Sequence, residues 1–232
     1  MALSHSPKIV TDGLDEVIDA GDPKCLTASD SIQGRINQLS NVRNGSGITF
    51  SDGVTNSTGV GGNFSWTRSI DWAQTSFTFS GWGNRDDLDN DKEGRIVDVV
   101  NAGNGHLRIT LKTNPTFIFR PTAGGGYNLV TATQTINAGQ WYNLVVTKEG
   151  QTSGGSADYV MYLNGEQIAT NTSSALVTDS NFTRYRLMRS ADDDSSNISW
   201  LGKFGPFYSY TRALTAVEVL QNYNATKGRF GL

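Results

Sequence analysis

The stretch 140–170, QWYNLVVTKEGQTSGGSADYVMYLNGEQIAT, decides the fold. Asn164 and Gly165 separate two strand-like runs, and Asn-Gly is the pair favoured in a type I′ turn because both positions need a positive φ angle. Residues 141–146 alternate with a period of two, yet both of their faces are partly apolar. Such a strand is typical of the centre of a layered sheet. The stretch therefore predicts a central strand followed by a β-hairpin.

The same alternation recurs on both sides of this stretch. Leu107, Ile109 and Leu111 share one face of a strand, and Phe77 and Phe79 share one face of another. Runs rich in Gly, Asp and Asn separate further strands, which we predict over 94–101, 116–121, 127–136, 184–190 and 204–213. The pattern predicts an all-β fold of two stacked antiparallel sheets.

The chain is interpreted as one domain over residues 1–232, without a linker or a fixed repeat. Residues 1–70 are rich in Gly, Asn and Ser, and we expect an irregular part that adds edge strands. Residues 71–214 form the main sandwich, and 215–227 form a terminal helix and tail.

Charge and composition exclude several classes of protein. The net charge is −3 without a cluster of Lys and Arg, so no nucleic-acid partner is expected. No apolar run has the length of a membrane span. Cys25 is the single cysteine, which excludes an internal disulfide and suggests a small buried thiol. The first residues lack the features of a signal peptide, so synthesis in a cytoplasm is expected.

The ending TRALTAVEVLQNYNATKGRFGL, residues 211–232, predicts the one helix. Thr215 and Glu218 have the spacing of a capping box, and Leu214 is placed to act as a hydrophobic staple. Gly228 is expected to end the helix. The face predicted to pack on the sandwich is Val217, Leu220, Tyr223 and Asn224.

Three motifs give this chain a resemblance to a known family. They are Trp141-Tyr142 opening a strand, the hairpin Tyr162–Gly165, and an ending that contains Tyr210, Arg212, Leu214, Thr215 and Glu218. In this order they resemble the laminin-G-like branch of the concanavalin A-like lectin/glucanase superfamily. The resemblance implies a jelly-roll sandwich with a short C-terminal helix.

The beginning of the chain resembles structural proteins of tailed bacteriophages, especially phages of marine cyanobacteria. Residues 6–14 and 19–24 carry this likeness. Residues 31–47 depart from the usual pattern, so the resemblance implies no binding role for the early loops. The resemblance implies a virion location, with other virion proteins as partners. A homo-oligomer is also expected, because repeated weak contacts gain strength through multivalency.

Two acidic runs are candidate calcium sites, because calcium prefers several oxygen ligands carried by one loop. In the first run Asp98 follows Asp87 by eleven residues, like the last ligand of an EF-hand loop, but Lys92 stands where that loop needs glycine. The alternative is that each run is a solvated acidic loop without a metal ion, and this interpretation is favoured for both runs. The candidate ligands are Asp87, Asp89 and Asp91 in the first run and Asp192, Asp193 and Asp194 in the second.

An aromatic ring beside a polar strand end is the candidate sugar site. Trp82, with Asn84 nearby, is the best placed of the five tryptophans to stack on a sugar ring, whereas Trp141 is structural by its family position. His106 falls on the side of its strand that alternation assigns to solvent.

No catalytic residues are predicted. Laminarinases with this fold use a Glu-x-Asp-x-x-Glu strand, and none of the glutamates has that spacing. The sequence therefore favours a non-enzymatic virion structural protein: a capsid decoration, fibre or tail-associated subunit. The alternative is an adhesin that binds host-surface glycans, with or without calcium, and a glycoside hydrolase ranks third.

Overall fold

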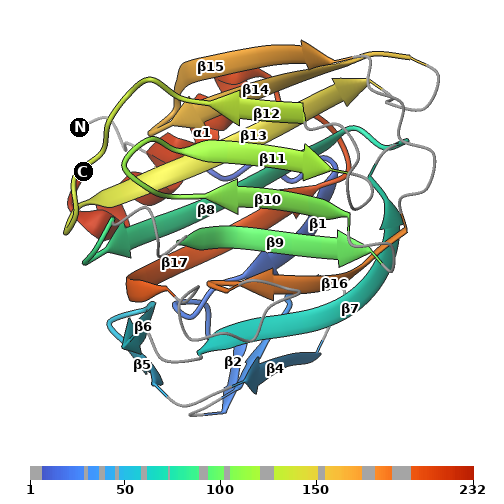
Figure 1. Cartoon of the computed structure of the whole chain (residues 1–232). Coiled ribbons are helices and arrows are strands. Elements are labelled where there is room, and N and C mark those ends of the chain that lie inside the picture. The colour runs from blue at the N-terminus through green and yellow to red at the C-terminus, as the bar shows by residue number, and fades with distance from the viewer. Residues whose placement is uncertain are drawn as a thin grey trace.

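The computed structural model describes residues 7–28, 31–36, 40–44, 47–58, 62–72, 74–88, 94–101, 105–120, 128–150, 155–173, 181–189 and 200–232. Two antiparallel sheets lie face to face (Figure 1). In chain order the strands are β1 (Leu14–Ile18), β2 (Leu26–Ala28), β3 (Ser31–Gln33), β4 (Ser40–Asn44), β5 (Ile48–Ser51), β6 (Val54–Thr58), β7 (Asn63–Asp71), β8 (Phe77–Arg85), β9 (Arg95–Asn101), β10 (His106–Thr110), β11 (Thr116–Arg120), β12 (Asn128–Thr131), β13 (Trp141–Gly150), β14 (Ala157–Leu163), β15 (Glu166–Ser173), β16 (Asn181–Leu187) and β17 (Leu201–Tyr210).

The strand order places the central hairpin of the sequence in the first sheet. That sheet runs β15-β14-β13-β8-β17-β6-β5, and β1 pairs with the second half of β17. The second sheet runs β12-β11-β10-β9-β16-β7-β4-β3-β2. Strands from residues 1–70 thus enter both sheets: β5 and β6 end the first, and β2, β3 and β4 end the second. This arrangement confirms the predicted antiparallel sandwich.

The predicted hairpin is present between β14 and β15. Asn164 and Gly165 have φ angles of 52° and 84°, as a type I′ turn requires. One predicted strand is shorter than expected: 127–136 contributes only β12, which ends at Thr131. After β12 the backbone of Ile136 bonds to Thr113, a loop residue, so the ladder ends although the sequence stays strand-like.

Alternate side chains from the two sheets form the core. Phe77, Ile109 and Leu144 are each fully buried, and they come from three different strands of the two sheets. Phe77 and Phe79 lie on the inner face with ring centroids 5.0 Å apart, and Phe77 also contacts Phe117 of the opposite sheet. Burial of this kind, at roughly 25 cal/mol per Å² of apolar surface, is the main source of stability in a chain without a disulfide.

The terminal helix α1 (Ala216–Thr226) begins as predicted. Thr215 is the N-cap, and the reciprocal bonds of the capping box with Glu218 are both present. The α-helix ends just before Gly228, as predicted, with Lys227 as its C-cap, but a 3-10 turn (Lys227–Phe230) follows it without a break. Gly231, with a φ angle of 75°, is the residue that adopts the left-handed conformation.

The helix packs on the first sheet mainly through residues other than the predicted ones, although Tyr223 of the predicted face stacks on Trp82. Val219, Asn222 and Thr226 are buried, whereas Val217 is 76% exposed and Leu220 is 44% exposed. The reason is polar bonding: Asn222 donates to the Tyr210 hydroxyl at 3.0 Å and accepts the Val10 peptide N–H at 2.7 Å. Periodicity of apolar residues does not detect such a face.

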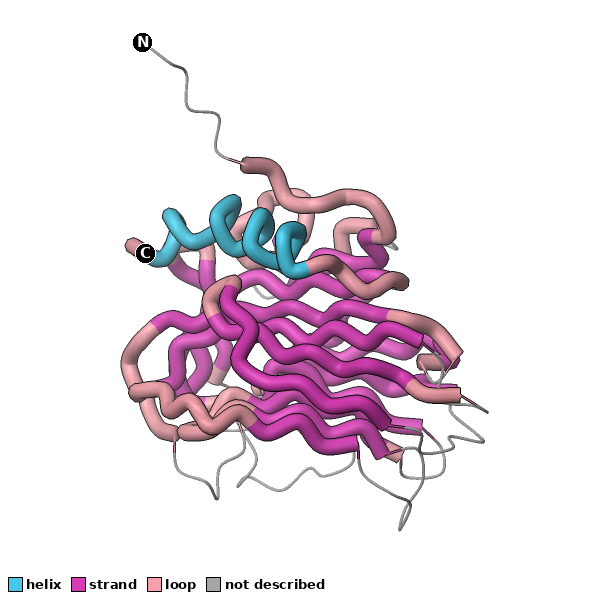
Figure 2. The backbone as a smooth tube through the Cα atoms, turned by 90° about the horizontal axis from the view of Figure 1, so that it is seen from above, coloured by secondary structure: helices cyan, strands magenta, loops and turns pink. Residues whose placement is uncertain are grey.

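The helix and the N-terminal segment share one outer side of the sandwich (Figure 2). Leu214, just before the helix, and Val219 of the helix lie in one buried cluster with Val10 and Val17 of the N-terminal part, separate from the core between the sheets. None of the described residues forms a helix long and apolar enough to cross a membrane.

Glu218 makes the helix start sensitive to acid. Arg212 donates two hydrogen bonds to its carboxylate, at 2.9 and 2.6 Å, and these lower the pKa of Glu218 to about 2. Because the folded-state pKa is below the unfolded value of 4.5, this stabilisation is complete above pH 4.5 and is lost as the pH falls towards 2.

We therefore expect Glu218→Gln to lower the free energy of unfolding by about 1 kcal/mol at neutral pH, the usual size of a capping contribution. Urea unfolding between pH 2 and 5 should show a flatter pH dependence than in the unaltered protein. Glu166→Gln is the matched control, because Glu166 is exposed on β15. Equal pH slopes for the two variants would contradict this account.

Candidate functional site

Four strands of the first sheet bring polar and aromatic side chains into one row on its outer face. In register, Trp141 of β13 lies beside Asn84 of β8, and Asn84 lies beside Lys203 of β17. Lys203 in turn lies beside Asn56 of β6. Residues separated by more than a hundred positions in the sequence thus become neighbours through strand pairing.

A hollow of about 180 Å³ opens over this row. The β5–β6 turn forms one wall: Asp52 and Gly53 have φ angles of 53° and 72°, so this is a second two-residue turn with two left-handed positions. Hydroxyl, carboxylate, amide, ammonium and aromatic groups all reach the hollow. Its lining is Ser51, Asp52, Val54, Asn56, Trp141, Lys203, Arg229 and Phe230.

The C-terminal residues form the opposite wall and are held by Arg229. Its guanidinium donates to both carboxylate oxygens of Asp19, at 2.7 and 2.9 Å, and to the Gly53 carbonyl at 2.6 Å. The hydrogen bonds to Asp19 raise the pKa of Arg229. Asp19 therefore balances the charge of Arg229, whereas within the described residues no ion pair involves the exposed Lys203.

Trp141 is the only one of the five tryptophans that is not buried. Its ring contacts Phe230 with centroids 4.3 Å apart, and part of it remains exposed at the hollow. An indole held in place by a second ring, with apolar surface open to solvent, is suited to stacking on a planar or cyclic ligand.

The prediction that Trp82 stacks on a sugar is wrong. Its side chain is 1% exposed, because Tyr223 and Phe230 pack against the ring at 5.7 and 4.4 Å. The indole N–H donates to the Thr226 hydroxyl at 3.1 Å. Asn84 is close to the hollow but does not line it, since its amide donates to the Gly139 carbonyl at 3.1 Å. The terminal helix thus occupies the position assigned to a ligand.

The candidate calcium ligands are only partly described. Asp87 is partly exposed just after β8, whereas Asp89, Asp91, Asp192, Asp193 and Asp194 lie outside the described residues. Within the described ranges, no three His, Cys, Asp or Glu side chains gather as a metal site.

Asp98, the expected last ligand of the Asp87 loop, faces cations instead. Its carboxylate is fully buried in an ion pair with Arg95, and the Arg108 Nε atom lies 3.5 Å from it. His106 is also buried, with Nδ1 3.5 Å from Asp98, so the prediction of an exposed His106 is wrong. Alternation predicted that His106 lies on the outer side of its strand, but its side chain is buried there.

Two of the described glutamates, Glu16 and Glu218, make structural contacts. Glu16 is 1% exposed and accepts the peptide N–H groups of Val17 and Ile36, both at 2.9 Å. Glu218 caps the helix, and Glu166 is exposed beside the hairpin turn. Cys25 is fully buried as expected, and burial raises the pKa of its thiol to about 11.

A sequence comparison identifies one family over most of the chain. A family model for the concanavalin A-like lectin/glucanases superfamily matches residues 46–220, about three quarters of the chain. No curated protein sequence matches the chain.

Solved structures with the same fold come from proteins of low sequence identity. The binding domain of Paraclostridial mosquitocidal protein 1 is 19% identical with a TM-score of 0.68, over 92% of this chain and 52% of that one. Trypanosoma rangeli sialidase is 12% identical with a TM-score of 0.70, over 97% of this chain and 36% of the sialidase. Domain 4 of AbnA, a GH43 extracellular arabinanase from Geobacillus stearothermophilus, was solved in complex with arabinotriose. It is 14% identical with a TM-score of 0.64, over 90% of this chain and 98% of that domain.

These likenesses show the fold. The chain spans about half the length of the toxin's binding domain and about a third of the sialidase, but it matches nearly the whole of the arabinanase domain.

Proposed function

Because the chain belongs to the concanavalin A-like lectin/glucanase superfamily, we propose that it is a non-enzymatic virion surface protein that binds carbohydrate in the Trp141 hollow. The observation that supports this proposal is the set of aromatic and polar side chains that line the hollow. Fold alone does not determine function, since one sandwich supports many activities.

The chemistry of the hollow suits a saccharide. The C–H face of a sugar ring stacks on an indole, and its hydroxyl groups both donate and accept hydrogen bonds. Asn56 and Asp52 offer amide and carboxylate oxygens, and Lys203 offers an ammonium donor. The hollow is small beside a typical ligand pocket of 300–1,000 Å³, which suits one or two sugar units at the end of a longer glycan.

Two of the structural neighbours support a binding role. One is a toxin's binding domain, and the other is a domain of an arabinanase that was solved with arabinotriose. The arabinanase domain has nearly the same extent as this chain. These are properties of those proteins, and for this chain they favour recognition of a glycan.

A role without catalysis is supported by the carboxylates near the hollow. A glycosidase needs two carboxyl groups on either side of the bond that is cleaved, about 5–10 Å apart. Among the described residues that line the hollow, Asp52 is the only acid. Asp19 lies nearby, but it is paired with Arg229.

The virion setting rests on the likeness of residues 6–14 and 19–24 to phage structural proteins. In the fold, 14–18 become β1, and Lys8 and Val10 bond to the helix, so this part of the chain is built into the domain. Other virion proteins and further copies of the chain are the partners proposed in this setting. Calcium remains a proposed cofactor, to be tested together with the glycan.

A glycan array probed with the protein, with and without calcium, tests carbohydrate binding. We expect the protein to bind host-surface glycans on the array. Lys203→Ala and Asn56→Ala should each weaken binding to the tightest-bound glycan at least tenfold, about 1.4 kcal/mol. Lys24→Ala, which removes another exposed lysine away from the hollow, should leave binding unchanged. The proposal is overturned if no glycan binds under either condition, or if all three variants bind equally well.

A further inference from the structure

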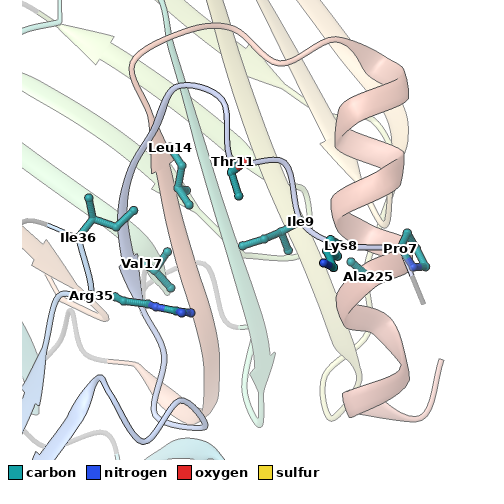
Figure 3. A pocket seen from close by; sticks show the side chains of 9 residues that line it. All are labelled: Pro7, Lys8, Ile9, Thr11, Leu14, Val17, Arg35, Ile36 and Ala225. Carbon is teal, nitrogen blue, oxygen red and sulfur yellow. The ribbon is translucent and has the colours of Figure 1, made fainter. Parts of the chain in front are cut away.

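A larger groove lies between the N-terminal segment, β1 and the last turn of the helix (Figure 3). Its volume is about 570 Å³. Ile9, Leu14, Val17 and Ile36 supply apolar surface to it. Ile36 is 44% exposed and is one of four large hydrophobic side chains that are exposed among the described residues.

One wall of this groove is a firmly held backbone segment. The Val10 N–H donates to Asn222 at 2.7 Å, and the Val10 carbonyl accepts from the Tyr210 hydroxyl at 3.1 Å. Gln221 donates to the Lys8 carbonyl at 2.7 Å. These bonds fix the segment against the helix and leave Ile9 on the groove side.

The peptide group of Ile9 offers further bonding capacity. Within the described residues, no hydrogen bond uses its N–H or its carbonyl. Consecutive residues of an extended segment present their peptide groups to opposite sides, so those of Ile9 point away from the contacts of Val10. A fixed backbone with a free peptide edge is what an added strand needs.

The second wall, formed by Arg35 and Ile36, is hydrogen-bonded to β1. The Arg35 N–H donates to the Val17 carbonyl and the Ile36 N–H to the Glu16 carboxylate, both at 2.9 Å. The exposed side chain of Ile36 therefore stands on an ordered backbone, so that the groove is preformed.

The charges at the groove are of one sign. Lys8 and Arg35 lie towards its two ends (Figure 3), and the described residues that line it include no carboxylate. Arg35 is paired with Asp22 at 2.9 Å, yet its side chain remains 47% exposed. An occupant with acidic groups at its ends and an apolar middle is complementary to this arrangement.

We propose that the groove binds an extended, acidic peptide segment of a partner protein. Its apolar side chains lie against Ile9 and Ile36, its carboxylates face Lys8 and Arg35, and its main chain bonds to the Ile9 peptide group. A lipid acyl chain would fill the apolar part but would leave that peptide group unused. This interaction is separate from carbohydrate binding and does not rest on it.

Short peptides test the proposal by isothermal titration calorimetry. The probe is acetyl-Asp-Val-Thr-Val-Asp-amide, and the comparison peptides replace both aspartates by lysine or both valines by serine. We expect the first peptide to bind with a Kd of about 0.1–1 mM, an affinity usual for so short a segment, and each comparison peptide to bind at least tenfold more weakly.

Variants of the groove locate the binding. Ile36→Ser should weaken the first peptide at least fivefold, whereas Val217→Ser, which removes a more exposed apolar side chain outside the groove, should have no effect. Lys8→Glu combined with Arg35→Glu should reverse the preference in favour of the lysine peptide. Lys203→Ala should leave peptide binding unchanged, and Ile36→Ser should leave glycan binding unchanged, so that the two proposals can fail separately.

Three results would overturn the inference. They are equal binding of the aspartate and lysine peptides, no loss with Ile36→Ser, and saturable binding of dodecanoate at the groove without binding of any peptide. Circular dichroism and thermal unfolding of each variant establish that the fold is intact.

Discussion

Replacing Trp82 by alanine is expected to lower the free energy of unfolding by about 3–5 kcal/mol, the usual cost of removing a fully buried large aromatic side chain. The ring joins three parts of the molecule: it extends from β8, packs against Tyr223 of the helix and against Phe230 beyond it, and donates to Thr226. Its loss leaves a cavity under the helix and removes the hydrogen bond that the Thr226 hydroxyl accepts.

Chemical unfolding with hydrogen exchange measures both consequences of Trp82→Ala. We expect the amides of α1 to lose protection more than those of β13, because the helix is attached to the sandwich through this contact. Leu220→Ala is the control, since that side chain is 44% exposed and should cost well under 1 kcal/mol. A loss below 1 kcal/mol for Trp82→Ala would mean that the helix is held by other contacts.

Removing the Asp98 carboxylate is the second change with a large expected effect. Asp98 is fully buried and Arg95 is 3% exposed, so Asp98→Ala removes a buried negative charge beside a buried guanidinium. Breaking a buried ion pair in this way costs about 3–5 kcal/mol. Asp22→Ala breaks the exposed pair with Arg35 and should cost less than about 1 kcal/mol.

Replacing both residues of the pair tests whether the cost of Asp98→Ala comes from the buried charge of Arg95. If the cost of Asp98→Ala comes from the buried charge, Asp98→Leu with Arg95→Met should recover part of the lost stability, because two apolar side chains need no partner. Urea unfolding of the unaltered protein and of these three variants gives the comparison. Similar costs for Asp98→Ala and Asp22→Ala would show that water or other groups already screen the buried pair.

The fold could be predicted from sequence because its signals are local. Alternation gives the two faces of a strand, Asn164-Gly165 gives the turn, and Thr215 with Glu218 gives the helix start, each within a few residues. The helix face was not predictable in this way. Asn222 is buried through its bonds to Val10 and Tyr210, and neither partner is within ten positions of it.

The candidate site depends on contacts that are distant in sequence. Trp141 and Asn56 are brought to one hollow by the pairing of four strands and by the C-terminal residues that cover Trp82. Alternation shows that Trp82 leaves the inner face of its strand, but it cannot show that a helix covers that side. The turn beside the hollow, in contrast, could have been predicted, because the Asp52-Gly53 pair is a local sequence signal for it.

The most direct test of the carbohydrate site follows the five indole N–H signals by NMR while the best array glycan is added. Trp141 is partly exposed at the hollow, whereas Trp66, Trp72, Trp82 and Trp200 are buried and serve as internal references. We predict a saturable shift of the Trp141 signal that Lys203→Ala weakens, with the Trp72 and Trp200 signals unchanged. An unmoved Trp141 signal at saturating glycan would contradict the account.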